Sequence, residues 1–161
     1  MTGPTIMAAQ AAIQFLKECW MQPSFEKQPL RFSCTQCGRC CLTGGDYYVY
    51  LTETESEVIR KRLQLSSNWF RRRYLERLEE GELVLASGED DCCIFLDTSG
   101  QCRVYAVRPL QCRTYPFWPE LTGSARAWSS EARRCEGINR GPVIPVATIR
   151  RSVNACLDQK N

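Results

Sequence analysis

The chain has 161 residues, of which 43% are hydrophobic and 24% are charged, and its formal net charge is +3. This length suits one domain with terminal additions, and the ordinary composition argues against a disordered chain. The chain contains eleven cysteines and no histidine. A metal site must therefore be built from sulfur, with some oxygen at most, and the commonest general base near neutral pH is missing, so we lean against an enzyme while leaving that question open.

Two frameworks could use so many cysteines, namely disulfides in an oxidising compartment or reduced thiols around a metal. The cysteine total is odd, and residues 1–22 lack both the basic start and the cleavage pattern of a secretory signal. No apolar run approaches the roughly 20 residues of a membrane span. We therefore expect a cytoplasmic protein with reduced thiols and no membrane span. Because thiolate charge could offset the small basic surplus, we expect no nucleic-acid partner.

Helical and strand patterns alternate along the first part of the chain. An apolar face over 5–21 predicts a helix that ends before Pro23, and a linker between two prolines leads from it to residue 30. Alternation over 47–51 predicts a short strand. Thr52 and Glu55 then form a capping-box pattern at the start of a helix over 53–63, whose inward side chains are predicted to be Val58, Ile59 and Leu63.

A second helix is predicted over 67–81, with Gly81 as its end. Its buried stripe is predicted to be Trp69, Phe70, Tyr74, Leu75 and Leu78. The basic run beside that stripe could contact phosphate or an acidic surface, but a charge run on an amphipathic helix is more often a solvated face. The residues of this run are Arg71, Arg72 and Arg73.

The remaining patterns predict strands over 83–86 and 93–96, a polar turn over 97–100, one helical turn over 109–112 and a terminal helix over 145–157. Cys19 and Cys156 lie on apolar helix faces, so we interpret both as core residues rather than ligands. Together these patterns predict a small single domain of the α+β class, mostly helical, with short strands framing a cysteine-rich metal site.

The densest cysteine segment is CTQCGRCC, at residues 34–41. Two residues between cysteines allow a tight turn in which both sulfurs face one point, as in zinc and iron–sulfur sites. Gly38 can take the positive φ that such a turn often needs. A disulfide knot is disfavoured because Cys40 and Cys41 are adjacent, and neighbours rarely bridge each other without strain. The segment therefore predicts a metal or iron–sulfur site.

Further cysteines follow in constrained stretches. The turn over 97–100 is predicted to bring Cys93 and Cys102 together, and Cys112 lies in a proline-bounded run. Cys135 precedes two glycines, a pattern that suits a loop close to a metal. Three arginines near these cysteines could hydrogen-bond to sulfur or neutralise it, or they could face solvent beside an aromatic wall. These arginines are Arg103, Arg108 and Arg113.

The ordered motifs resemble the YkgJ-type cysteine-cluster family, described as a candidate zinc- or iron-chelating domain with a CxxCxxCC signature. The resemblance rests on F-x-C-x-x-C-G-x-C-C from Phe32, C-x-F-L from Cys93, C-x-V-Y-x-x-R-P-x-x-C-R-T-Y-P-F from Cys102 and C-x-G-I-x-x-G from Cys135. It implies a domain at 30–142, preceded by a helix and linker at 1–29 and followed by a helix at 143–161 that packs on it.

By this resemblance the metal ligands are eight cysteines that bind Zn²⁺ or iron, including a 4Fe-4S cluster. They are Cys34, Cys37, Cys40, Cys41, Cys93, Cys102, Cys112 and Cys135. They divide into two four-ligand sets, or into one cluster with a second ion or redox pair. Because Cys40 and Cys41 are adjacent, we expect their side chains to diverge. They would then bind different centres, or one of them would contact the metal's ligands without binding the metal itself. Cys92 departs from the pattern.

Two further interpretations stay open. The same domain resembles part of bacterial flagellin lysine N-methylases, which implies methyl transfer with an iron–sulfur cofactor. The chain, however, has no glycine-rich nucleotide loop after a strand and is too short for a usual methyltransferase domain beside the cysteines. The other interpretation is an assembly or interaction factor, in which a structural metal core presents its helices to a protein partner.

Overall fold

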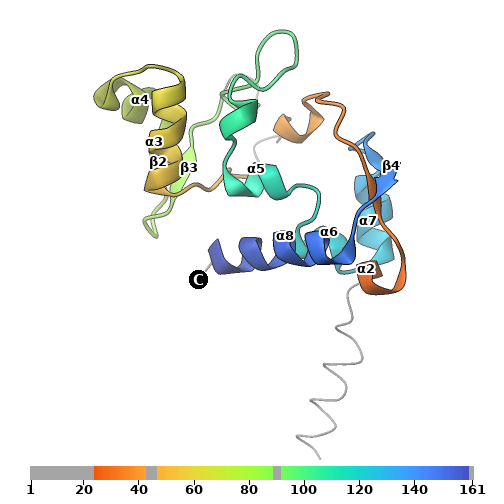
Figure 1. The fold of residues 1–161 in the computed structure, drawn as a ribbon. Coiled ribbons are helices and arrows are strands. Elements are labelled where there is room, and N and C mark those ends of the chain that lie inside the picture. The colour runs from red at the N-terminus through yellow and green to blue at the C-terminus, as the bar shows by residue number, and fades with distance from the viewer. Residues whose placement is uncertain (1–23, 43–46, 89–91, 160–161) are drawn as a thin grey trace, which may run out of the picture.

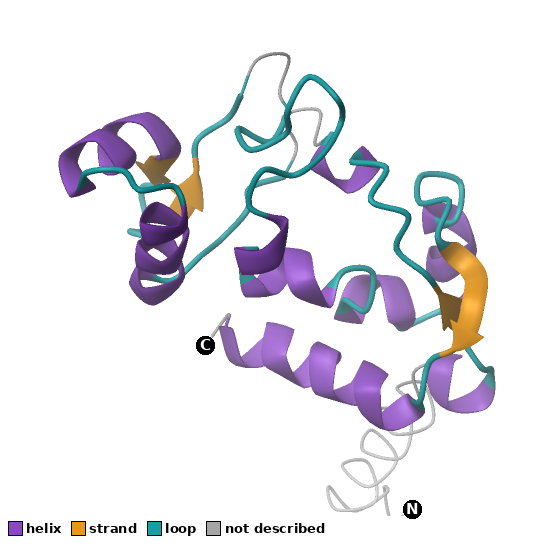
Figure 2. Ribbon diagram, turned by 45° about the horizontal axis from the view of Figure 1, so that its top comes forward, coloured by secondary structure: helices purple, strands orange, loops and turns teal. Residues whose placement is uncertain are grey.

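The computed structural model describes residues 24–42, 47–88 and 92–159. Two groups of elements flank a central region of loops, and α8 runs from one group beneath α5 toward the other (Figures 1 and 2). Helices and two short antiparallel sheets together give the α+β fold that the sequence predicts. The helix predicted over 5–21 lies outside the described residues.

The helices are α2 (Ser24–Lys27), α3 (Glu53–Arg62), α4 (Ser67–Tyr74), α5 (Leu110–Thr114), α6 (Pro119–Thr122), α7 (Ala125–Glu131) and α8 (Val146–Gln159). Short 3-10 turns are η1 (Arg39–Cys41) and η3 (Tyr105–Val107). The strands are β1 (Arg31–Phe32), β2 (Leu75–Arg77), β3 (Leu83–Leu85) and β4 (Ile138–Val143). None of the helices in the described ranges is long and apolar enough to cross a membrane.

The first group packs α3 and α4 against the β2–β3 hairpin. Helix α3 begins as predicted, because the Thr52 hydroxyl accepts a hydrogen bond from the Glu55 amide while the Glu55 carboxylate accepts one from the Thr52 amide. Aromatic rings stack inside this group, with Tyr74 between Phe70 and Phe95. We call its buried residues the α3–α4 core: Leu51, Ile59, Phe70, Leu83, Leu85, Phe95 and Val104.

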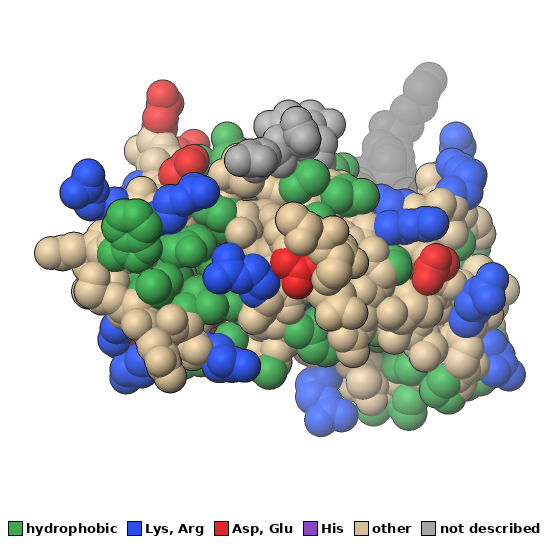
Figure 3. All heavy atoms as spheres, turned by 90° about the horizontal axis from the view of Figure 1, so that it is seen from above, with side chains coloured by type: hydrophobic (Ala, Val, Ile, Leu, Met, Phe, Trp, Pro, Cys, Tyr) green, Lys and Arg blue, Asp and Glu red, His purple; other side chains and the backbone are tan. Residues whose placement is uncertain are grey.

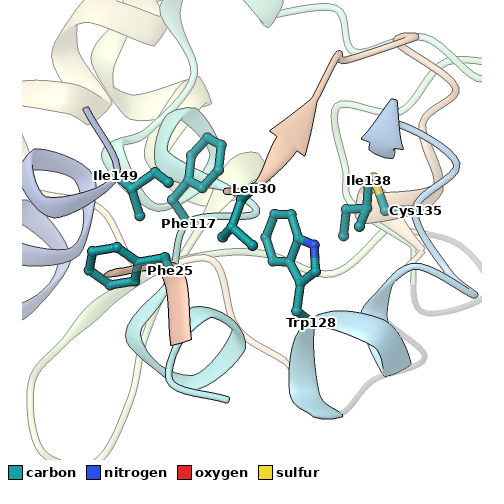
Figure 4. Close-up of a cluster of buried hydrophobic side chains, with 7 residues drawn as sticks. All are labelled: Phe25, Leu30, Phe117, Trp128, Cys135, Ile138 and Ile149. Carbon is teal, nitrogen blue, oxygen red and sulfur yellow. The ribbon is translucent and has the colours of Figure 1, made fainter. Parts of the chain in front are cut away.

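The second group joins both ends of the described chain. Strand β1 pairs antiparallel with β4, and α2 packs with the helices that follow α5. Figure 4 shows the buried side chains, which we call the α7–α8 core: Phe25, Leu30, Phe117, Trp128, Cys135, Ile138 and Ile149. Cys135 lies beside Ile138 at one end of this cluster, away from Phe25 and Ile149 (Figure 4). A cysteine predicted as a ligand therefore forms the edge of this core.

The prediction of one long helix over 67–81 is wrong. Helix α4 ends at Tyr74, and the next three residues form β2, which pairs with β3. Gly81, with φ of 98°, lies in the turn of that hairpin, where its amide donates to the Leu78 carbonyl. Two predicted core residues are also exposed, Trp69 at 57% and Val58 at 46%. The apolar residues of the predicted stripe belong partly to α4 and partly to β2, and side chains repeat with different periods in a helix and in a strand.

Two predicted strands and one linker also differ from the structure. Residues 47–51 and 93–96 form isolated bridges instead of strands, Tyr50 with Val84 and Cys93 with Ser87. Between Pro23 and Pro29 the chain forms α2, because burying Phe25 stabilises a short helix there. By contrast, the helical turn near Cys112, the terminal helix and the turn over 97–100 occur within about two residues of their predicted positions.

The two glycines after Cys135 lie against Ser33, just before the first cysteine of the CTQCGRCC segment. A Cβ on Gly137 would lie 2.3 Å from the Ser33 carbonyl oxygen, and a Cβ on Gly141 would lie 2.6 Å from the Ser33 Cβ. Both glycines therefore let β4 approach the chain just before Cys34. Their effect on the cysteines is indirect, because they bring the segment of Cys135 close to the segment of Cys34.

Candidate metal centre

All eight predicted cysteines line one cavity of about 690 Å³. Cys34, Cys37 and Cys40 are exposed, Cys41, Cys93, Cys102 and Cys112 are half-buried, and Cys135 is buried. They come from the loop after β1, from η1, from the loops before α5, from α5 itself and from the turn after α7. The chain therefore brings sulfurs from distant segments to one place between the two cores.

The thiol of Cys41 interacts with several other cysteines of the cavity. It is within hydrogen-bonding reach of three other thiols, those of Cys40, Cys93 and Cys102. The Cys93 amide also donates to the Cys41 carbonyl over 2.8 Å. Cys40 and Cys41 also act on each other, and their assignment to different centres stays a prediction.

Hydrogen bonding within this group separates the thiols by acidity. Hydrogen bonding with Cys41, opposed by burial and assisted by the charge of Arg108, lowers the pKa of Cys40 to about 7 and that of Cys102 to about 6. Hydrogen bonding with Cys41 also lowers the pKa of Cys93. Hydrogen bonding with Cys102, Cys40 and Cys93 raises the pKa of Cys41. Because the Cys41 thiol carries one proton, it donates to one of these neighbours at a time and favours the thiolate form of the one that accepts.

Two tyrosines connect the remaining sulfurs to the walls of the cavity. Tyr105 interacts with Cys34 through a side-chain hydrogen bond, which raises the pKa of that phenol. The Tyr115 hydroxyl donates to the Glu131 carboxylate over 2.6 Å and also contacts the Cys135 thiol. Burial raises the pKa of Cys135, an effect that the Tyr115 contact opposes.

Burial also raises the pKa of Cys112, on α5, and the charges of Cys93, Cys40 and Cys102 raise it further. The same helix meets α8 through a 3.1 Å contact between the Thr114 hydroxyl and the Cys156 sulfur. Cys156 is buried, as predicted for a core residue, but it also lines the cavity as a ninth sulfur.

Gly38 fits the CxxCG turn against the turn over 97–100. Its φ is 72°, and a Cβ there would lie 2.2 Å from the Gly100 carbonyl oxygen. That second turn is closed by the Asp97 carboxylate, which accepts hydrogen bonds from the amides of Ser99 and Gln101, each over 2.9 Å. This second turn lies between Cys93 and Cys102. The close contact at Gly38 therefore fixes the position of the CxxCG turn relative to the turn between those two cysteines.

The three predicted arginines behave differently from one another. The Arg108 guanidinium lies 3.7 Å from the centre of the Tyr105 ring, and its charge acts on the sulfurs of Cys40 and Cys102. Arg113 lies 3.7 Å from the Glu55 carboxylate. Arg103 acts on the carboxylate of Asp97. Among these contacts, only those of Arg108 concern sulfur.

Sequence reasoning missed several residues at the site. Arg134 lies 92 residues from Leu42 along the chain, donates to its carbonyl over 2.8 Å and lowers the pKa of Cys40. Tyr105 and Tyr115 stand within the quoted motifs, three residues after Cys102 and Cys112 respectively, and that spacing was the available signal. Cys92 does not line the 690 Å³ cavity, whereas its neighbour Cys93 does.

The donor set fits a thiophilic metal. The gathered sulfurs come without histidine, which suits Zn²⁺ or iron–sulfur chemistry. Within residues 24–42, 47–88 and 92–159, no three Cys, Asp or Glu side chains are arranged to hold an ion as they stand. Ligation therefore requires thiols that already contact one another to rotate onto a common point, which changes of side-chain rotamer can accomplish.

Basic side chains are dispersed over the face of the molecule that Figure 3 shows. Figure 3 shows Lys and Arg over both halves of that face rather than in one patch. Near the sulfurs, the charges of Arg108 and Arg134 lower the pKa of Cys40, and the charge of Arg108 also lowers that of Cys102.

The family of the chain follows from a match over residues 33–136, which covers well over half of it. The matching model is CxxCxxCC, described as a "putative zinc- or iron-chelating domain". No solved structure gave a significant match. The matched range begins just before Cys34 and ends just after Cys135, so it contains the eight predicted cysteines but not Cys156. The chain belongs to the CxxCxxCC family.

Proposed function

We propose that this protein is a metal-binding module in which eight thiolates hold Zn²⁺ or an iron–sulfur cluster. The ligands are Cys34, Cys37, Cys40, Cys41, Cys93, Cys102, Cys112 and Cys135. The observation that carries this proposal is that sulfurs from distant segments line one cavity in a chain without histidine. Thiolates supply the soft donors that both kinds of centre use.

Electrostatics favours a cation in this position. Three neighbouring thiols have lowered pKa values, and thiolates so close together would repel one another. The charges of Arg108 and Arg134 offset part of that repulsion. A bound metal would offset much more of it and would also deprotonate Cys41, since a coordinating thiol loses its proton. None of the eight proposed ligands is part of a disulfide in the structure.

An iron–sulfur protein with a ligand pocket is the second candidate. A zinc ion with four thiolates is a closed structural site, whereas this cavity extends beyond the sulfurs to Tyr47, Tyr48 and Trp118. Tyr105 and Arg108 would line the path between such a ligand and the sulfurs. When bound, a cluster would supply electron transfer or an iron position open to a ligand.

We also propose the extent of the module. Residues 30–142 would form the metal-binding domain, because β1 and β4 pair across that span and enclose the matched range. Residues 143–161 would stabilise it from outside through α8, whose Ile149 is fully buried in the α7–α8 core. On this view the terminal helix contributes packing while the metal ligands come from the residues before it.

Metal analysis of anaerobically purified protein tests the proposal. We expect either zinc without visible absorbance or iron and acid-labile sulfide in matching amounts with a brown colour. The matched variants are C93S and C92S, which replace neighbouring cysteines of which only Cys93 lines the main cavity. C93S should lose metal, and C92S should keep it. Protein without metal, or a C93S variant as fully loaded as C92S, would contradict the proposal.

A further inference from the structure

Helix α5 carries one proposed ligand, Cys112, but it spans only five residues, Leu110–Thr114. A single helical turn has few hydrogen bonds of its own, so contacts from outside must fix its orientation. In Figure 1 it lies above α8, in the middle of the molecule. Since a metal ligand must be held close to its required geometry, whatever holds α5 also determines where the Cys112 thiol lies.

The side chain of Gln111, the residue before Cys112, joins α5 to the backbone of residues 48–50. Its amide oxygen accepts a hydrogen bond from the Tyr50 amide over 2.8 Å, and its amide nitrogen donates to the Tyr48 carbonyl over 3.1 Å. A backbone N–H only donates and a backbone carbonyl only accepts, so these partners fix the orientation of the side-chain amide. Both ends of that amide are therefore held.

The extended segment 48–50 has two edges, and Gln111 occupies one of them. On the other edge the segment bonds to β3, through the Leu51 amide and the Val49 carbonyl. The Tyr50 amide and the Tyr48 carbonyl point the opposite way, where a further strand would pair. The Gln111 side chain offers one acceptor and one donor there, as a neighbouring backbone would. It thereby attaches α5 to the half of the molecule that contains β3.

The backbone around Gln111 is held as well. The Trp118 indole N–H donates to the Gln111 carbonyl over 2.9 Å, from the chain just before α6. At the start of α5, the Glu55 carboxylate accepts from the Leu110 amide over 2.6 Å. The motif around Cys112 leaves position 111 unspecified, so it gives no reason for a glutamine there. The structure supplies one, because this side chain makes two of the contacts that hold the helix of a proposed ligand.

We propose that Gln111 is a positioning residue for the metal centre, which places the Cys112 thiol by clamping α5 to residues 48–50. This rests on the proposed function, since Cys112 is one of its eight ligands. Gln111 acts through Cys112 rather than as a ligand, because both polar atoms of its amide are engaged by backbone groups. Loss of this amide should therefore weaken metal binding only in a protein that retains Cys112.

The test is the zinc affinity of Q111M, measured by competition with a chromogenic chelator under anaerobic conditions. Methionine is close to glutamine in length and volume but makes neither hydrogen bond. We expect zinc to bind about 10-fold more weakly, as for other substitutions of residues that support metal ligands. Q101M is the matched control. Gln101 also directly precedes a proposed ligand, Cys102, but its exposed side chain makes no hydrogen bond with another described residue. Q101M should bind zinc as wild type does.

Two further variants separate positioning from general destabilisation. In a C112S protein, Q111M should weaken zinc binding by about twofold or less, because two changes that act through one ligand are not additive. I149V removes a buried methylene group from the α7–α8 core and should leave zinc affinity unchanged. Cobalt(II) gives a spectroscopic readout, in which the thiolate-to-cobalt absorption should fall in Q111M and C112S but not in Q101M. Circular dichroism verifies that each variant is folded.

Three results would overturn the positioning role of Gln111: Q111M that binds zinc as tightly as Q101M, a 10-fold loss that persists in the C112S protein, or an equal loss in I149V. C112S that binds zinc as tightly as wild type would remove Cys112 from the ligands, and the role of Gln111 with it, while leaving the other cysteines as ligands. Wild type that binds neither zinc nor iron would instead overturn the proposed function.

Discussion

The α3–α4 core and the α7–α8 core are assembled from differently spaced parts of the chain. The first takes all its buried residues from one stretch of the chain, residues 51–104. The second joins Phe25 and Leu30 to residues between 117 and 149. Contacts between residues near in sequence form faster than contacts that require a long loop to close. The α3–α4 half can therefore organise locally, whereas the other half depends on bringing both ends together.

The cysteines lie where this difference matters most. Cys93 and Cys102 pack on the half built from nearby residues, and Cys135 belongs to the half that joins both ends of the described chain. Cys34, Cys37, Cys40 and Cys41 occupy the segment between them. Hydrogen bonds also cross the junction, such as that from the Tyr50 amide to the Gln111 side chain over 2.8 Å and that from the Leu110 amide to the Glu55 carboxylate over 2.6 Å. Metal binding is thus expected to stabilise the junction more than either core.

Metal removal should have the largest effect. A chelator strong enough to strip the protein should cost on the order of 10 kcal/mol of stability, as for other structural thiolate sites. Hydrogen exchange should show protection lost first over 34–42, 93–104 and 110–114, and later around Ile59 and Ile149. Chelator with excess zinc is the control. Equal loss of protection in all these segments would show that the metal stabilises the junction no more than it stabilises the two cores.

Substitutions in the two cores should come next in size. Ile59 and Ile149 are both fully buried, one in each core. I59A and I149A should each lower the free energy of unfolding by about 2 to 5 kcal/mol, and the valine variants by about 0.5 to 1.5 kcal/mol. Because the sites share no contacts, the double variant should be additive within about 0.5 kcal/mol in urea unfolding. A coupling well above that would mean that the cores are one unit.

The G38A variant should act on the junction itself. Its Cβ would meet the Gly100 carbonyl 2.2 Å away at a positive φ, so we expect a loss of about 3 kcal/mol and weaker metal binding. G100A is the matched control, since its φ is 78° but a Cβ there meets nothing within 4 Å. It should cost about 1 kcal/mol and leave metal affinity unchanged. Equal metal affinity in the two variants would contradict the role of this contact.

The smallest expected effect is that of E55Q. The Glu55 carboxylate caps α3, accepts from the Leu110 amide over 2.6 Å and lies 3.4 Å from the Gln159 amide, so it joins three helices across the junction. Weakening these charge-assisted bonds should cost about 1 to 2 kcal/mol in thermal unfolding. Glu57 pairs only within α3 in the contacts described, with Arg60 and Lys61, so E57Q should leave stability unchanged. Equal losses would refute the bridging role of Glu55.

Sequence patterns predicted the elements whose signals are local. The capping box at Thr52, the Asp97 turn and the terminal helix each depend on residues within a few positions of one another. The gathering of the eight cysteines was expected from motif order and family resemblance, and they do line one cavity. Their role as ligands stays a prediction.

The features that sequence patterns missed depend on distant partners. The β1–β4 pair joins Arg31 to Val143, and no local periodicity marks either short strand. Leu75 ends the apolar stripe of α4 but pairs with Leu85, so tertiary pairing overrode the helical pattern. Likewise, the Arg134 contact with Leu42 exists only once the two ends of the metal-binding region have met.

Metal-edge X-ray absorption on the purified, loaded protein tests most directly whether distant cysteines share a metal. We predict a first shell of about four sulfurs per metal at about 2.3 Å for zinc, with no nitrogen and no more than a trace of oxygen. A first shell dominated by oxygen or nitrogen would contradict the account, because it would mean that the sulfurs gathered at the junction are not the ligands.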